Sequence, residues 1–168
     1  MNKRQLKEQS LLLLLSQNNF IVPEIQREYV WGQNKEVISR FLDSILEKIG
    51  IVCDYCGNPK MNSKINVGFL YTYKPNYVTY NYERYLDENI IDGQQRFTTL
   101  ILLLFYCALK EDRIEDFKNV IRLDTDLEMA FDYKVRNLTH IFLLQIVNKV
   151  DKIEDLKLIF EGKATWFL

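Results

Sequence analysis

The most apolar stretch of the chain runs from Phe97 to Leu109, where most positions are hydrophobic. A helix that is apolar on most of its faces is normally buried. Immediately before it, Asn89–Ile91 has the composition of a short buried strand, and Asp92-Gly93 is a turn signal. The pattern therefore predicts a strand, a sharp turn and a buried central helix, around which the rest of the chain is expected to fold.

The rest of the hydrophobic pattern alternates between helical and extended periodicity. The clearest helix follows Asn34, a suitable N-cap, and carries apolar residues on one face as far as Ile49. The full prediction, in chain order, is helix 3–17, strand 20–22, helix 35–49, a hairpin of strands 65–73 and 77–82, the strand and helix described above, a hairpin of strands 119–124 and 127–133, and helices 136–150 and 151–160.

A polar cluster, Asp92-Gly93-Gln94-Gln95-Arg96, separates the buried strand from the central helix. Burying such groups costs free energy unless they find partners. A helix N-terminus offers unpaired N–H groups and a positive dipole end, both of which suit an anion. Arg96 adds a fork of donors that matches phosphate or carboxylate, and Asp92 can accept from a hydroxyl or hold a metal ion. The cluster therefore indicates a phosphate site, in the first place for a nucleotide.

A purely structural interpretation uses the same residues. Asp92 would cap the helix, Gly93 would relieve the turn, and Arg96 would pair with a surface acid. The two adjacent glutamines favour a binding site, because neither Gln94 nor Gln95 is needed for capping, yet each offers donors and an acceptor.

Composition narrows the classes of protein that need to be considered. The chain has 168 residues, 48% apolar and 27% charged, which is typical of one globular domain spanning residues 1–168. Its formal net charge of −1 gives no general attraction to DNA or to anionic membranes. No secretory signal pattern and no apolar run of membrane-spanning length is present, so we expect a cytoplasmic protein without a membrane partner. The apolar end, Thr165-Trp-Phe-Leu168, suggests a cut through a longer polypeptide or a segment that docks elsewhere.

The cysteines and the single histidine give little support for a zinc site or a redox centre. Cys53 and Cys56 have CxxC spacing, but a zinc site needs a second ligand pair, and His140 is distant in sequence. We therefore interpret the pair as incidental to a loop. Cys107 is expected to be a small buried hydrophobe, and His140 a helix-surface or packing residue.

Several stretches together resemble one known family. Residues 21–31, IVPEIQREYVW, resemble its "IPxYQRxYxW" motif, Val67–Leu70 resembles a strand "fLGsi", and Ile91–Leu100, IDGQQRFTTL, resembles its "DGQQRLTTL" signature almost residue for residue. Phe131–Arg136 with Ile141–Leu143 weakly resembles a later "LxYxxR…FL" motif. The family is the DGQQR domain at the N-terminus of GmrSD-type modification-dependent restriction enzymes and related phage-defence proteins. It is related to the ParB/sulfiredoxin fold, and the resemblance covers most of residues 5–145.

The resemblance implies an α/β fold of the ParB/sulfiredoxin type, with a small mixed sheet flanked by helices and a helical C-terminal part. It also implies nucleotide binding and hydrolysis at the Asp92–Arg96 junction, coupled to DNA restriction. We expect Mg²⁺ or another divalent cation to accompany the nucleoside triphosphate. Two positions depart from the family pattern: Ile25 replaces a usual tyrosine, and Tyr71 follows Leu70 where small residues are usual.

The resemblance implies which residues belong to the site, and we assign their roles as a hypothesis. The catalytic set is Asp92, Gln94, Gln95 and Arg96, with Asp92 as the metal ligand. The nucleotide-binding set is Gln26, Arg27, Tyr29, Trp31, Gly93 and Arg96.

The nuclease of such proteins usually lies in a C-terminal HNH-type domain, whose chemistry needs clustered histidines and a metal. With a single histidine, this chain is expected to lack that domain and to reach DNA through the full-length protein. Two other interpretations remain open: a DNA-binding ParB-like module without catalysis, and a plain interaction domain.

Overall fold

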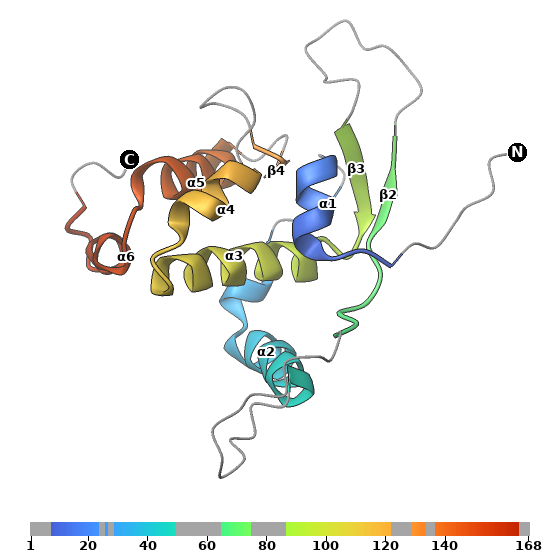
Figure 1. Ribbon diagram of the computed structural model, residues 1–168, viewed down its shortest axis with the longest axis horizontal. Helices are drawn as coiled ribbons and strands as arrows, with labels where there is room; N and C mark the ends of the chain where they lie inside the picture. Colours follow the sequence, from blue (N-terminus) through green and yellow to red (C-terminus); the bar gives the residue numbers. More distant parts are fainter. Residues whose placement is uncertain are drawn as a thin grey trace, which may run out of the picture.

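The computed structural model describes residues 8–23, 26, 29–49, 65–74, 87–121, 129–133 and 137–164. These residues form a mixed α/β fold, as predicted (Figure 1). The elements are α1 (Leu11–Gln17), β1 (Asn19–Val22), the 3-10 helix η1 (Trp31–Gln33), α2 (Lys35–Ile49), β2 (Tyr71–Tyr73), β3 (Asp87–Asp92), α3 (Gln94–Lys110), α4 (Ile114–Ile121), β4 (Phe131–Tyr133), α5 (Asn137–Lys149) and α6 (Ile153–Phe160).

The four strands form one mixed sheet in the order β2-β3-β1-β4. β1 runs parallel to both of its neighbours, with Ile21 opposite Asn89 of β3 and Asp132 of β4, whereas β2 is antiparallel to β3. The carboxyl ends of β1, β3 and β4 therefore lie along one edge of the sheet. In α/β sheets, loops from distant parts of the sequence converge at such an edge.

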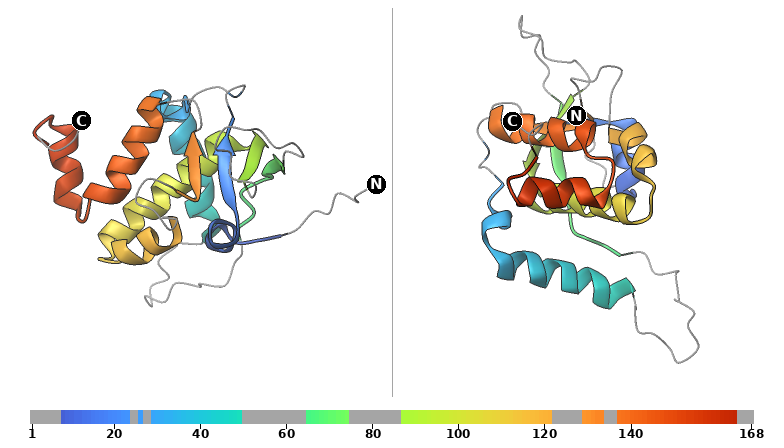
Figure 2. Two further views of the ribbon diagram at one scale, coloured as in Figure 1. Left: turned by 90° about the horizontal axis from the view of Figure 1, so that it is seen from above. Right: turned by 90° about the vertical axis from the view of Figure 1, so that its left-hand side faces the viewer.

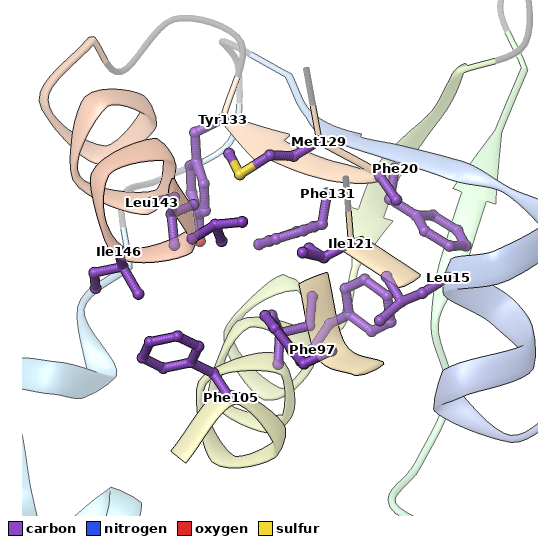
Figure 3. Packing of buried hydrophobic residues seen from close by; sticks show 14 of the residues in the cluster. Leu15, Phe20, Phe97, Phe105, Ile121, Met129, Phe131, Tyr133, Leu143 and Ile146 are labelled. Carbon is purple, nitrogen blue, oxygen red and sulfur yellow. The ribbon is translucent and has the colours of Figure 1, made fainter. Parts of the chain in front are cut away.

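One face of the sheet packs on α3 through a chain of aromatic rings. Phe97 of α3 lies edge-on between Phe20 of β1, at 5.1 Å between ring centroids, and Phe131 of β4, at 5.4 Å. Tyr133 continues the chain beyond Phe131 at 5.6 Å. All four rings are buried, and the edge-to-face geometry is the one that aromatic pairs prefer (Figure 3).

α3 is the buried central helix that the pattern predicts. α4 and α6 pack against it, α1 packs against α4, and α5 packs against β4 (Figure 2). One detail of the prediction is wrong: Cys107 is exposed, because it lies on the outward strip of α3 together with Tyr106. No helix in the described part of the chain is long and apolar enough to cross a bilayer.

Two elements are clearly shorter than predicted, each for a local reason. The first helix starts only at Leu11, because the hydroxyl of Ser10 accepts from Leu13 N–H and caps it. The predicted strand 65–73 shortens to β2, since Gly68 adopts a φ of +103° that breaks an extended ladder.

The second predicted hairpin is wrong. Residues 119–121 belong to α4, whose buried Ile114, Phe117 and Ile121 follow a helical period, and β4 pairs in parallel with β1 instead. Several other predictions lie outside the described residues: residues 3–7 of the first predicted helix, strand 77–82, the loop cysteines Cys53 and Cys56, site residue Arg27, the departure at Ile25, and the end of the chain at 165–168.

Tyr133 ties the sheet to the start of α3 through its hydroxyl. The oxygens of Tyr133 and Thr98 are 2.8 Å apart, and the Thr98 hydroxyl donates its one proton to the carbonyl of Gln94 at 2.8 Å. Tyr133 must therefore be the donor in the bond to Thr98. Burial raises the pKa of Tyr133 to about 12, because desolvation disfavours the phenolate.

This pKa shift predicts a loss of stability at high pH. The unfolded tyrosine titrates near 10, so Tyr133 remains protonated in the folded state where the unfolded state loses its proton. The free energy of unfolding should fall as pH rises from about 10 to 12, by up to about 2.7 kcal/mol from this group. Urea unfolding over this range should show a shallower decline for Tyr133→Phe than for wild type. Tyr106→Phe, at a 45% exposed position, is the control and should keep the wild-type slope.

Candidate functional site

The two polar segments that the sequence singles out meet at the carboxyl edge of the parallel strands. β1 and β3 are neighbours, and Gln26 and Asp92 follow or end them at the same edge. The side-chain amide of Gln26 donates to the Ile91 carbonyl at 3.0 Å, across 65 residues of sequence. The fold thus brings the first motif and the Asp92–Arg96 junction together.

Gln95 holds the two segments together. Its Oε1 accepts from the backbone N–H of Val30 at 2.9 Å and of Trp31 at 3.3 Å, while the residue itself is only 5% exposed. Buried polar groups need such partners, and here one side chain satisfies two backbone donors of an irregular segment.

A second link lies one turn further along α3. The hydroxyls of Tyr29 and Thr99 are 3.0 Å apart, and Thr99 donates to the Gln95 carbonyl at 2.8 Å, so Tyr29 donates to Thr99. The two threonines of the signature thus perform parallel tasks. The Thr98 hydroxyl accepts a hydrogen bond from Tyr133 of β4, and the Thr99 hydroxyl accepts one from Tyr29 in the segment after β1.

A small cleft of about 140 Å³ opens where these segments converge. The first turn of α3 borders it, and the N-cap of that helix is Gly93, at φ 92°, which has no side chain to cap the N–H groups. The interpretation in which Asp92 caps the helix is therefore wrong. The lining residues are Gln26, Trp31, Ile91, Asp92, Gly93, Gln94, Gln95 and Arg96.

Arg96 reaches from this cleft to the segment before β2. Its Nη2 donates to the Phe69 carbonyl at 3.1 Å, and its guanidinium lies over Gly68, where an added Cβ would stand 2.1 Å from Nη1. Arg96 thus bonds a backbone carbonyl rather than the surface acid of the structural interpretation. The contact is close on the other side too, since a Cβ on Gly93 would lie 2.7 Å from the Phe69 oxygen.

The predicted metal site rests on one exposed carboxylate, that of Asp92. Among the described residues, no group of three or more His, Cys, Asp or Glu side chains is placed to hold an ion. Mg²⁺ commonly takes one or two carboxylates and completes its shell with water and phosphate oxygens, so Asp92 suits that ion when a phosphate accompanies it. His140 lies elsewhere, with Nδ1 2.7 Å from the Asp132 carboxylate, and joins α5 to β4.

Most of the site residues named from sequence line the cleft or hold its walls. Tyr29 is a wall residue, held by Thr99, and Arg27 lies outside the described residues. Sequence reasoning missed the supporting roles of Thr98, Thr99 and Gly68. The spacing of the threonines was an available signal, because each hydroxyl lies four residues after one of the two glutamines, where it can reach that carbonyl.

Replacing Gln95 should test its clamping role. Gln95→Met keeps the length of the side chain but leaves the Val30 and Trp31 N–H groups without their acceptor, which should lower the free energy of unfolding by about 1–3 kcal/mol. Chemical denaturation measures the loss, and Trp31 supplies a fluorescence signal at the affected segment. Gln33→Met, at an exposed position of η1, is the matched control and should change stability little. Equal effects of the two variants would contradict the clamp.

Replacing Gly93 should lower the free energy of unfolding for two reasons, which can be measured separately. A side chain at positive φ costs about 1–2 kcal/mol, and at Gly93 a Cβ must also displace the Phe69 carbonyl, which adds about 1–3 kcal/mol of overpacking. Gly162, at φ +66° with nothing within 4 Å of its ideal Cβ, reports the backbone cost alone. Urea unfolding should show Gly93→Ala to be clearly less stable than Gly162→Ala. Similar losses would mean that segment 66–70 yields without cost.

Comparison with known proteins assigns the chain to a family. The family described as GmrSD restriction endonuclease, N-terminal domain, matches residues 11–164, a span that contains every described helix and strand from α1 to α6. Neither a search of curated proteins nor a search of solved structures found a match. The chain belongs to the family of GmrSD restriction endonuclease N-terminal domains.

Proposed function

We propose that this domain is a regulatory component of a DNA-modification-dependent restriction system, and that it binds and hydrolyses a nucleoside triphosphate with Mg²⁺ at the Asp92–Arg96 junction. The family supports a place in a restriction system. The observation that carries the nucleotide proposal is the convergence of two distant polar segments on one helix N-terminus, with a cleft between them.

The cleft is suited to phosphate groups rather than to a complete nucleotide. Its volume of about 140 Å³ is well below the ~300 Å³ at which small-molecule sites usually begin. The first turn of α3 offers backbone N–H groups and the positive end of the helix dipole, and Arg96 offers charged donors. A charge-assisted hydrogen bond of this kind contributes roughly 1.5–3 kcal/mol, so a few of them are enough for binding.

The observed contacts support a different proposed role for each signature residue. Gln95 uses its side-chain oxygen on Val30 and Trp31, and Gln94, which also lines the cleft, would position the attacking water. Asp92, exposed at the cleft, would hold Mg²⁺. Arg96 would neutralise the charge that develops on the transferred phosphoryl group.

The first motif would complete this site. Trp31 lines the cleft with an apolar ring beside the proposed phosphate site, whereas the Tyr29 hydroxyl is engaged with Thr99. Gln26 holds the Ile91 carbonyl at the cleft wall, and Arg27 would supply a second positive charge.

Two other functions remain as alternatives. A DNA-binding module without catalysis would show a steep salt dependence of duplex binding and no response to nucleotide. The net charge of −1 argues against strong non-specific binding by this chain. A plain interaction domain would respond to neither ligand.

Ligand-induced stabilisation tests the proposal directly. A ligand at a hundred times its Kd stabilises the folded state by about 2.7 kcal/mol, and each kcal/mol raises Tm by roughly 2–4 °C for a chain of this size. ATP or GTP with Mg²⁺ at millimolar concentration should therefore raise Tm by several degrees, and Arg96→Ala should abolish the shift.

Arg40 supplies a matched control. It is an exposed arginine that forms an ion pair with Glu36 on the surface of α2, so Arg40→Ala should keep the nucleotide response. The absence of any shift with the four common nucleoside triphosphates would overturn the proposal. A shift that survives in Arg96→Ala would place the nucleotide elsewhere.

A further inference from the structure

A second and larger cleft also has Arg96 among its lining residues. It measures about 290 Å³ and is formed between α2 and residues 65–68. α2 extends away from the main body of the domain (Figures 1 and 2). Four of its residues line the opening. The walls that matter here are Phe41, Ser44, Ile45 and Lys48 of α2, together with Asn66 and Arg96.

Arg96 lines both clefts and forms the wall that they share. An aromatic contact links them as well, since Trp31 of the smaller cleft lies edge-on to Phe41 of the larger one, at 5.3 Å between ring centroids. The two openings are therefore neighbours that share Arg96 as a lining residue.

The chemistry of the larger cleft differs from that of the smaller one. Phe41 and Ile45 supply apolar surface, and Lys48 and Arg96 supply positive charge. Among the described residues that line it, none is acidic. Apolar walls with a few placed polar groups are typical of sites for small organic ligands, and Arg96, which also lines the smaller cleft, favours a ligand whose adjoining part carries negative charge.

Two polar side chains in the cleft have defined hydrogen-bonding roles. Asn66 uses its Oδ1 to accept from Gly68 N–H at 2.9 Å, so its NH₂ group is the part that can donate to a ligand. Ser44 donates its hydroxyl proton to the Phe41 carbonyl at 2.7 Å, so its oxygen faces a ligand as an acceptor. One donor and one acceptor are the minimum for reading the edge of a base.

We propose that the α2 cleft binds the nucleoside part of the nucleotide whose phosphates lie at the Asp92–Arg96 junction, with Arg96 between the two. This inference rests on the proposed function and adds to it the place where the base and sugar are recognised. Neither cleft alone reaches the volume usual for a nucleotide-sized ligand, and the small one has the phosphate-binding chemistry.

Calorimetry can separate this inference from the proposed function. The probes are tripolyphosphate with Mg²⁺, which carries only the phosphate chain, and ATP, GTP, CTP and UTP with Mg²⁺. We expect at least one nucleotide to bind ten-fold or more tightly than tripolyphosphate. Ser44→Trp, which fills the α2 cleft, should reduce that nucleotide to the affinity of tripolyphosphate and leave tripolyphosphate binding unchanged.

α2 offers a matched control in its other serine. Ser39 is exposed and does not line the cleft, so Ser39→Trp should keep the full nucleotide advantage. Should Ser44→Trp fail to fold, Ser44→Met provides a flexible group that fills the cleft more gently and should give a partial loss in the same direction.

The outcomes are distinct. Equal binding of tripolyphosphate and all four nucleotides would overturn this inference and leave the phosphate site standing. A nucleotide advantage that persists in both Ser44 variants would overturn it too. Failure of every probe to bind would overturn the proposed function, and this inference with it.

Discussion

The site depends on one side-chain oxygen, Oε1 of Gln95. It lies in the first turn of α3 and accepts the backbone N–H groups of Val30 and Trp31, in a segment that has little regular structure of its own. Without that acceptor, two donors in a partly buried loop would have no ladder or helix to join. The two hydrogen bonds to Gln95 therefore hold this irregular segment in place as a wall of the cleft.

The same junction is held from its other sides by contacts that tolerate no added volume. Gly68 and Gly93 both adopt positive φ, and a Cβ at either would meet Arg96 or the Phe69 carbonyl at less than van der Waals distance. Tyr133 and Tyr29 each donate to a threonine that is itself bonded to a glutamine carbonyl. The DGQQR signature with its two threonines thus doubles as a packing motif, in which nearly every position makes a contact across the chain.

The parts of this arrangement that local pattern encodes were predictable. The polar cluster between β3 and α3 and the apolar length of α3 identify the central unit in the sequence. The parallel pairing of β1 with β3, which brings the two motifs to one edge, comes from the structure. The helix α4, part of which stands where the sequence predicted a strand of the second hairpin, was not predictable in the same way. It has only eight residues, and it packs against α3, which is a tertiary contact. Gly68 was missed because its role depends on the reach of Arg96, 28 positions later in the chain.

Arg96 has a structural role in the fold and, in the proposed function, a second role in binding phosphate. A guanidinium has five donors in a rigid fork, and one Nη2 bond to Phe69 leaves the others for a ligand. Because that bond and the contact with Gly68 fix the group, the charge is held in place before any ligand arrives. Preorganised charge loses little free energy to reordering when a phosphate binds, which makes it effective both in binding and in stabilising a transition state. A lysine at this position would carry the same charge but not the planar fork, so it could not hold segment 66–70 and face both clefts at once.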